Sequence, residues 1–152
     1  HVLQEGKDLT VVATSWMVVE ALLASKKLKN QNISVEIIDP RTVTPLDSQT
    51  MIKSVKKTGR LLICDYDWLY SGFSGEIAAQ INKYCFKELK APIERIGFSH
   101  VPCPTTRPLE NEFYPTARDI LFVAQKMLGL EKSVTISDDE LYSYENKFRG
   151  PF

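Results

Sequence analysis

The amino-acid sequence predicts an open α/β domain, in which helices cover both faces of a mainly parallel sheet and so form three layers. Two observations predict it. Apolar runs rich in β-branched residues recur along the chain, and stretches with helical spacing separate them. Strands that alternate with helices build right-handed crossovers, whose strands run parallel. The 152 residues fit one domain and suffice for a core without disulfides or a metal.

The N-terminal part contains the first two strand–helix units. The run at 9–13, Leu-Thr-Val-Val-Ala, predicts a strand, and Ser15 is a suitable N-cap for the apolar helical pattern that follows. The run at 33–38 predicts a second strand. Asp47 is then well placed to cap a helix that ends at Gly59.

The pattern continues with two further strands. Leu61–Asp65 predicts the third, and after a glycine-containing loop apolar residues recur at helical spacing as far as Cys85. The run at 92–96 predicts the fourth strand.

Residues 99–115 contain four prolines and predict a long ordered loop. A last amphipathic helix follows over 120–128 and ends near Gly129. We therefore divide the chain into a domain at 1–130 and a C-terminal extension at 131–152.

Composition narrows the functional classes. Nineteen basic and nineteen acidic residues leave no net charge, which argues against a nucleic-acid or membrane partner, and no run is long enough to span a bilayer. Three cysteines cannot all pair and show no metal-ligand spacing, so free thiols in a reducing compartment, the cytoplasm or the mitochondrial matrix, are expected. Because the chain opens on His1 without a methionine, we expect it to be an excerpt of a longer protein.

The segment around the glycine turn is the candidate ligand edge. Asp65 and Asp67 follow the third strand, at the edge where open parallel sheets bind ligands, and we expect Glu76 to converge with them. Gly72 and Gly75 either let a ligand approach the start of a helix or merely permit a tight turn and close packing. The three carboxylates suit acid–base chemistry, or else they are solvated or cap a helix.

Aromatic side chains precede and enter this turn: Tyr66, Trp68, Tyr70 and Phe73. Such a cluster suits a protein interface, and folding back onto the domain's own core is an equal alternative. The single histidine inside the fold, His100, has no visible orienting partner. We therefore assign no catalytic, cofactor-binding or metal-binding residue.

Several blocks, taken in order, resemble a known family. They are residues 5–12, 35–47 with Asp-Pro-Arg-Thr, 56–62 with Gly-Arg-Leu-Leu, 72–78, 101–104 with Val-Pro-Cys-Pro, Leu109-Glu110 and 113–115. The set resembles the C-terminal domain of transketolase-like enzymes, most of all that of the β subunit of the E1 component of 2-oxo acid dehydrogenases, of the pyruvate or branched-chain type. The likeness covers about residues 1–129.

The resemblance implies a five-stranded sheet whose edge strand, near residues 2–4, runs antiparallel to the rest. It also implies a parent oxidoreductase whose other domains hold thiamine diphosphate and magnesium, while this domain packs subunits together without turning over substrate. The implied partners are an E1 α subunit or a fused equivalent, a second β subunit and the E2 acyltransferase. The alternative is a free-standing small α/β binding protein or enzyme that uses the edge near Asp65, Gly72 and Glu76.

The C-terminal extension carries its own expectation. Its last part is aromatic, with Tyr142, Tyr144, Phe148 and Phe152, so we expect these rings to dock on the domain or on a neighbouring subunit. Residues 131–139 are expected to stay loose.

Overall fold

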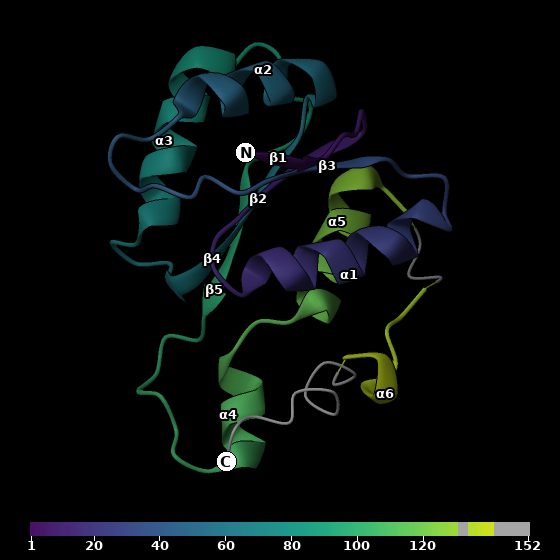
Figure 1. Ribbon diagram of the computed structural model, residues 1–152, viewed down its shortest axis with the longest axis vertical. Coiled ribbons are helices and arrows are strands. Elements are labelled where there is room, and N and C mark those ends of the chain that lie inside the picture. The colour runs from purple at the N-terminus through teal and green to yellow at the C-terminus, as the bar shows by residue number, and fades with distance from the viewer. Residues whose placement is uncertain (131–133, 142–152) are drawn as a thin grey trace.

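A five-stranded sheet forms the centre of the protein (Figure 1). The computed structural model describes residues 1–130 and 134–141. The strands are ordered β1-β3-β2-β4-β5, with β1 antiparallel to β3 and every other pair parallel. Their bounds are β1 Val2–Gln4, β2 Leu9–Ala13, β3 Val35–Ile38, β4 Leu61–Trp68 and β5 Glu94–Phe98. The predicted parallel sheet and its antiparallel edge strand are confirmed.

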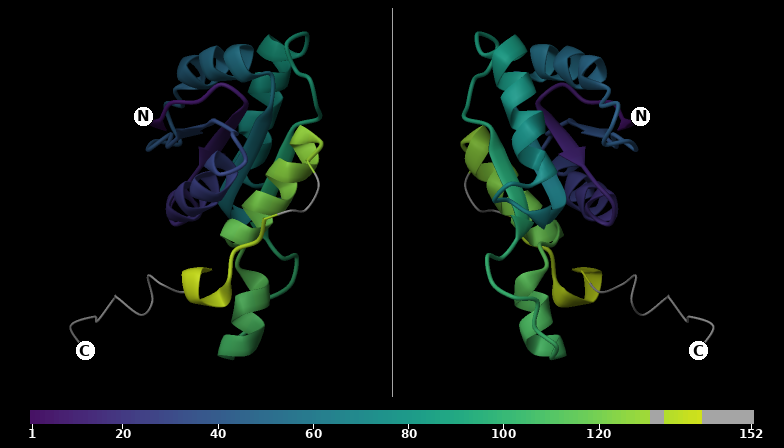
Figure 2. Two further views of the ribbon diagram at one scale, coloured as in Figure 1. Left: turned by 90° about the vertical axis from the view of Figure 1, so that its right-hand side faces the viewer. Right: turned by 90° about the vertical axis from the view of Figure 1, so that its left-hand side faces the viewer.

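Two layers of helices cover the sheet (Figures 1 and 2). On one face α1 (Met17–Lys29) and α5 (Ala117–Leu128) enclose one apolar core cluster. On the other face α2 (Ser48–Thr58) and α3 (Phe73–Cys85) enclose a second. The three predicted layers are therefore confirmed.

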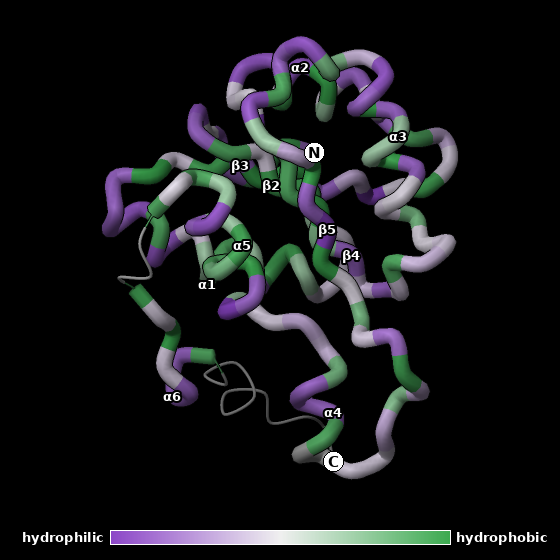
Figure 3. Tube along the Cα trace, turned by 180° about the vertical axis from the view of Figure 1, so that it is seen from behind, coloured by the Kyte–Doolittle hydropathy of each residue, from purple (hydrophilic) through white to green (hydrophobic). Residues whose placement is uncertain are grey.

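The central strands are buried on both faces because they feed both clusters. In β4, Leu62 and Cys64 point into the cluster under α1 and α5, whereas Leu61 and Ile63 point into the cluster under α2 and α3. This is the two-residue period of a strand, and it explains why the sequence shows a continuous apolar run rather than an alternating one. In Figure 3 the central strands include hydrophobic stretches, drawn in green, whereas several turns at the surface are hydrophilic, drawn in purple.

The predicted helix caps have mixed outcomes. Asp47 accepts a hydrogen bond from the Thr50 N–H at 3.1 Å, and Gly59 ends α2 in the left-handed region at φ 74°, both as expected. Ser15 is not the cap of α1: Trp16 occupies that position without a side-chain hydrogen bond. Backbone carbonyls of residues 14–16 already accept the first free N–H groups of this helix, so no hydroxyl is needed.

The structure contains more regular secondary structure than predicted in two places, the end of β4 and residues 107–113. Strand β4 continues beyond the predicted end at Asp65, as far as Trp68. The predicted loop at 99–115 contains a short helix, α4 (Arg107–Phe113), because a proline in the first helical turn removes only an N–H that has no partner there. In Figure 1, α4 lies below the sheet, away from the two helical layers.

Residues 134–141, here called the strap, pack along α1 and α5 and include the short helix α6 (Asp138–Leu141). Ile136 is only 2% exposed, and the Arg118 Nε atom donates to its carbonyl at 2.7 Å. Lys27 forms an ion pair with Glu140. The expectation that residues 131–139 stay loose is therefore wrong for 134–139, while the aromatic end of the extension, from Tyr142 onward, lies outside the described residues.

Candidate functional site

The carboxyl edge of the sheet has its topological switch point between β2 and β4, where open α/β folds usually bind ligands. Asp65 lies there and is 4% exposed. Its Oδ1 atom accepts the Thr14 hydroxyl at 2.8 Å, and its Oδ2 atom accepts the Ser74 N–H at 2.9 Å. The Tyr66 N–H in turn donates to the Thr14 hydroxyl at 3.2 Å. The polar groups at the switch point are thus bonded to one another.

The negative group at the start of α3 is therefore the protein's own carboxylate. Ser74 is the second residue of the helix after its N-cap, Gly72, which is the position from which a cap normally receives an N–H. Gly72 has φ −79°, open to any residue, but a Cβ atom there would lie 1.9 Å from the Trp68 carbonyl oxygen. The glycine serves close backbone approach, as the turn-and-packing interpretation held, and leaves no room for a ligand.

The expectation that three carboxylates converge is wrong. Asp67 is exposed and accepts the N–H of its neighbour Trp68 at 2.7 Å. Glu76 is exposed on α3 and accepts from Gln80 at 2.8 Å. Residues 65 and 67 would share one face of a regular strand, but the pairing of β4 with β5 shifts register between Cys64 and Trp68, and Asp67 lies in that irregular part. Glu76 lies on the exposed side of its helix. Only Asp65 caps a helix, which was one of the alternatives considered.

Arg95, the second residue of β5, supports the same turn. Its Nη1 atom donates to the Leu69 carbonyl at 3.1 Å and lies 3.5 Å from the Ser74 hydroxyl. A Cβ atom on Gly75 would lie 3.3 Å from that Nη1 atom, so the small residue lets the guanidinium approach α3. The Arg95 guanidinium thus bonds both the turn and the start of α3.

Half of the predicted aromatic segment packs inward. Tyr66 stacks on Tyr114 at 5.4 Å between ring centroids and meets Phe98 edge-on at 4.9 Å. Trp68 meets Phe98 and Phe113 edge-on at 5.7 and 6.2 Å. We call these five rings, Tyr66, Trp68, Phe98, Phe113 and Tyr114, the aromatic cluster. Edge-on and stacked rings at such distances stabilise one another beyond their buried area.

The rest of the segment is divided between the solvent and the opposite core. Tyr70 is 81% exposed and Trp68, at the rim of the aromatic cluster, is 40% exposed. Phe73 packs instead against the cluster under α2 and α3. The carboxyl edge thus exposes the rings of Tyr70 and Trp68, while Asp65, Thr14 and the Ser74 N–H are bonded to one another, a combination that suits contact with another protein surface.

Sequence reasoning missed two groups near this edge. The Tyr114 hydroxyl lies 3.5 Å from the Cys103 sulfur, and this hydrogen bond, with partial desolvation, raises the pKa of Tyr114 to about 12. Glu20 in α1 accepts the Ala117 N–H at 2.8 Å and the Trp16 indole N–H at 2.8 Å, and burial raises its pKa. Neither has a sequence signal, because their partners are distant in the chain or ordinary in type.

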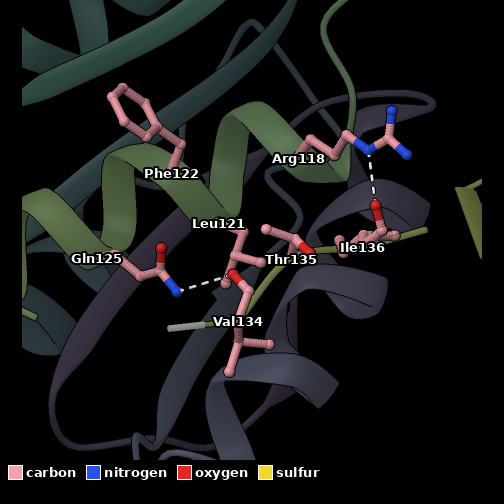
Figure 4. Close-up of a pocket in the computed structure, with 7 residues that line it drawn as sticks. All are labelled: Arg118, Leu121, Phe122, Gln125, Val134, Thr135 and Ile136. Carbon is pink, nitrogen blue, oxygen red and sulfur yellow. Dashed lines mark hydrogen bonds between the residues drawn. The ribbon is translucent and has the colours of Figure 1, made fainter. Parts of the chain in front are cut away.

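A hollow of about 410 Å³ lies between α5 and the strap (Figure 4). Its polar side chains already serve the strap: Arg118 donates to the Ile136 carbonyl, and Gln125 donates to the Val134 carbonyl at 3.2 Å. The remaining wall is mostly apolar, with Leu121 and Phe122. Both polar side chains of this wall therefore bond the strap.

Comparison with known proteins assigns the family. The family model "Transketolase, C-terminal domain" matches residues 1–120. The chain belongs to the transketolase C-terminal domain family. The pyruvate dehydrogenase E1 component subunit beta of Rickettsia felis is 40% identical over 126 residues, which are 83% of this chain and 39% of that protein. The acetoin:2,6-dichlorophenolindophenol oxidoreductase subunit beta of Cupriavidus necator is 36% identical over 128 residues, 84% of this chain and 38% of that protein.

A solved structure supports the same family. A split gene transketolase, described as an inactive beta4 tetramer, superposes with a TM-score of 0.71 at 28% identity and covers 87% of this chain and 43% of that one. This transketolase C-terminal domain thus spans about two fifths of the length of the relatives it matches. Homology to E1 β subunits disfavours the alternative of an unrelated ligand-binding protein.

The residues present do not fit the thiamine diphosphate and magnesium that the resemblance implies for a parent enzyme. Within 1–130 and 134–141, no three His, Cys, Asp or Glu side chains gather into a possible metal site. The start of α3, which lies at the switch point, is bonded to Asp65. In the same described part of this transketolase C-terminal domain, no helix is long and apolar enough to cross a bilayer.

Proposed function

We propose that this chain is the subunit-interaction domain of the β subunit of a thiamine-diphosphate-dependent 2-oxo acid dehydrogenase, and that it has no catalytic activity alone. The relatives that carry pyruvate and acetoin dehydrogenase names, and the short share of their length that this chain spans, support the proposal. In it, thiamine diphosphate and magnesium are held by parts of the parent enzyme outside this chain.

The observation that carries the proposal is the character of the carboxyl edge. Asp65 accepts hydrogen bonds from the Thr14 hydroxyl and the Ser74 N–H, whereas the rings of Tyr70 and Trp68 are exposed to solvent. A ligand or substrate needs free polar groups for orientation, and a protein partner needs an apolar surface that it can desolvate. The edge meets the second requirement.

The partners in this proposal follow from the family. An E1 α subunit or a fused equivalent, a second β subunit and an E2 acyltransferase are the proteins we expect to contact the domain. The compartment is a reducing one, the cytoplasm or the mitochondrial matrix. Free cysteines in the described chain agree with it, and a relative from Dictyostelium discoideum that is 37% identical over 129 residues, 85% of this chain and 36% of that protein, is named as mitochondrial.

Self-association tests the surface. The 152-residue chain should form dimers or larger species by sedimentation velocity at concentrations up to about 100 μM. Tyr70→Arg should weaken that association at least roughly tenfold, because a desolvated aromatic contact is replaced by a charge. Phe86→Arg is the matched control, since Phe86 is 72% exposed just after the end of α3.

Two results would contradict the proposal. One is a chain that stays monomeric throughout this range. The other is a result in which Phe86→Arg weakens self-association as much as Tyr70→Arg does. Clear decarboxylation of 2-oxo acids by the 152-residue chain with added thiamine diphosphate and magnesium would overturn its second part.

A further inference from the structure

A second surface lies at the opposite, amino edge of the sheet. A hollow of about 760 Å³ is bounded by the loop before β2, the last turns of α1 and the start of β3. Three lysines line it: Lys7 from the loop, and Lys26 and Lys29 from the helix. We call it the lysine groove.

These three ammonium groups have no carboxylate partner in the described chain, since none of them makes a hydrogen bond or ion pair with a carboxylate there. The neighbouring lysines differ, since Lys27 pairs with Glu140 and Lys57 pairs with Glu36. The groove therefore gathers three positive charges in a chain that has no net charge overall.

Two acids lie near the groove, and neither forms an ion pair with its three lysines in the described chain. Glu5 lines it, but its Oε2 atom lies 3.2 Å from the Lys57 ammonium. Asp8, next to Lys7 in the chain, accepts the Ser34 N–H at 2.8 Å. Both carboxylates thus have partners of their own.

Stabilisation of the helix end explains only part of this arrangement. Cations in the last turn of a helix interact favourably with its carbonyl end, and Lys26 and Lys29 fit that role. Lys7 does not, because it comes from a loop before another strand, yet it lines the same hollow. Stabilisation of the end of α1 therefore does not explain why a lysine from the loop lies at the same hollow as the two helix lysines.

The groove selects for spaced negative charges. Its polar floor is already bonded, since the Ser25 hydroxyl donates to the Gln4 side chain at 3.2 Å and the Gln4 amide donates to the Val35 carbonyl at 2.7 Å. Both floor side chains bond within the domain, so the lysines are the groups that would hold an anion. An extended chain with several carboxylates can meet all three lysines at once.

We propose that the lysine groove docks an acidic segment of a partner protein, in which several Asp or Glu side chains pair with Lys7, Lys26 and Lys29. This goes beyond the proposed assembly through Tyr70, because the groove lies at the other edge of the sheet. Charge complementarity carries the choice of partner, and the contact is expected to be fast and salt-dependent.

Fluorescence anisotropy with the 152-residue chain and a labelled peptide of about ten glutamates, roughly 33–36 Å long when extended, tests the proposal. The peptide should bind at low salt and weaken as salt rises. The triple variant K7Q/K26Q/K29Q should weaken binding at least roughly tenfold. The matched control K53Q/K56Q/K87Q makes the same charge change with exposed lysines of α2 and the residues after α3, beyond the other face of the sheet, and should weaken it less than about twofold.

Every outcome decides the question. No binding at low salt, or equal losses in the two triple variants, would overturn the docking proposal. So would an RNA oligonucleotide or an anionic lipid vesicle that binds the wild-type chain more tightly than the peptide does and depends on the same three lysines. Circular dichroism of both variants shows that a loss of binding is not a loss of fold. Because Tyr70 is unchanged in all of them, failure here leaves the assembly proposal untouched.

Discussion

Replacing Asp65 by asparagine should destabilise the chain by about 2 kcal/mol. The amide keeps the shape of the carboxylate but offers one acceptor where Asp65 uses two, toward Thr14 and Ser74. If the amide oxygen keeps the Ser74 N–H, its NH₂ group faces the Thr14 hydroxyl, which can turn and accept it. The loss is then the charge of a buried helix cap, which is worth more than a neutral hydrogen bond. Asp65→Ala removes both acceptors and should cost more.

Urea unfolding followed by circular dichroism measures this difference. For a chain of this size, 2 kcal/mol corresponds to a fall in thermal midpoint of roughly 4–8 °C. Asp67→Asn is the control, because Asp67 is exposed and bonds only its neighbour's N–H, so its cost should stay within about 0.5 kcal/mol. An Asp65→Asn variant as stable as the wild type would refute the assignment of Asp65 as an internal cap and reopen the switch point as a ligand site.

Three further outcomes are expected. Gly72→Ala should destabilise by more than about 2 kcal/mol in urea, because its Cβ would lie 1.9 Å from the Trp68 carbonyl oxygen, and a neutral result would contradict that approach. Burial would raise the pKa of Glu36, but hydrogen bonds, first of all from Lys57, hold this pKa below 4.5. The charged carboxylate therefore adds to the free energy of unfolding above pH 4.5, and this contribution is lost as the pH falls below 4.5. The difference in stability between wild type and Glu36→Gln should shrink over that range, and a constant difference would refute the prediction. Cys103 is exposed while burial raises the pKa of the other two thiols, so a thiol reagent should label one cysteine quickly and the others only on unfolding, as mass spectrometry would show.

The fold was predictable where its signals are local. Strands β2, β3 and β4 are buried on both faces, so their apolar runs stand out, and Asp47 and Gly59 mark the ends of α2 by their own conformational preferences. Strand β4 was cut short at Asp65 because its last part is polar and aromatic, yet pairing of Trp68 with Phe98 on β5 continues the ladder. Helix α4 was missed because a proline at a first helical turn looks like a proline in a loop.

The candidate site was predictable in place but not in chemistry. The sequence places Asp65, Gly72 and Glu76 near one sheet edge, and that is correct for Asp65 and Gly72. Which carboxylate turns inward depends on the register shift between Cys64 and Trp68 and on partners such as Thr14, 51 residues away. The long-range contact from Glu20 to the Ala117 N–H spans 97 residues and has no local pattern at all.

The strap has a consequence for how this domain opens. Helices α1 and α5 are joined near their starts by Glu20 and the Ala117 N–H and near their ends by Gln125, whose amide donates to both Gln31 and the Val134 carbonyl. The strap therefore bonds to the same side chain that joins the two helices. The three segments should exchange their amide hydrogens as one cooperative unit, separate from the layer of α2 and α3. The family model ends at residue 120, inside α5, so this unit extends past the boundary that the family model draws.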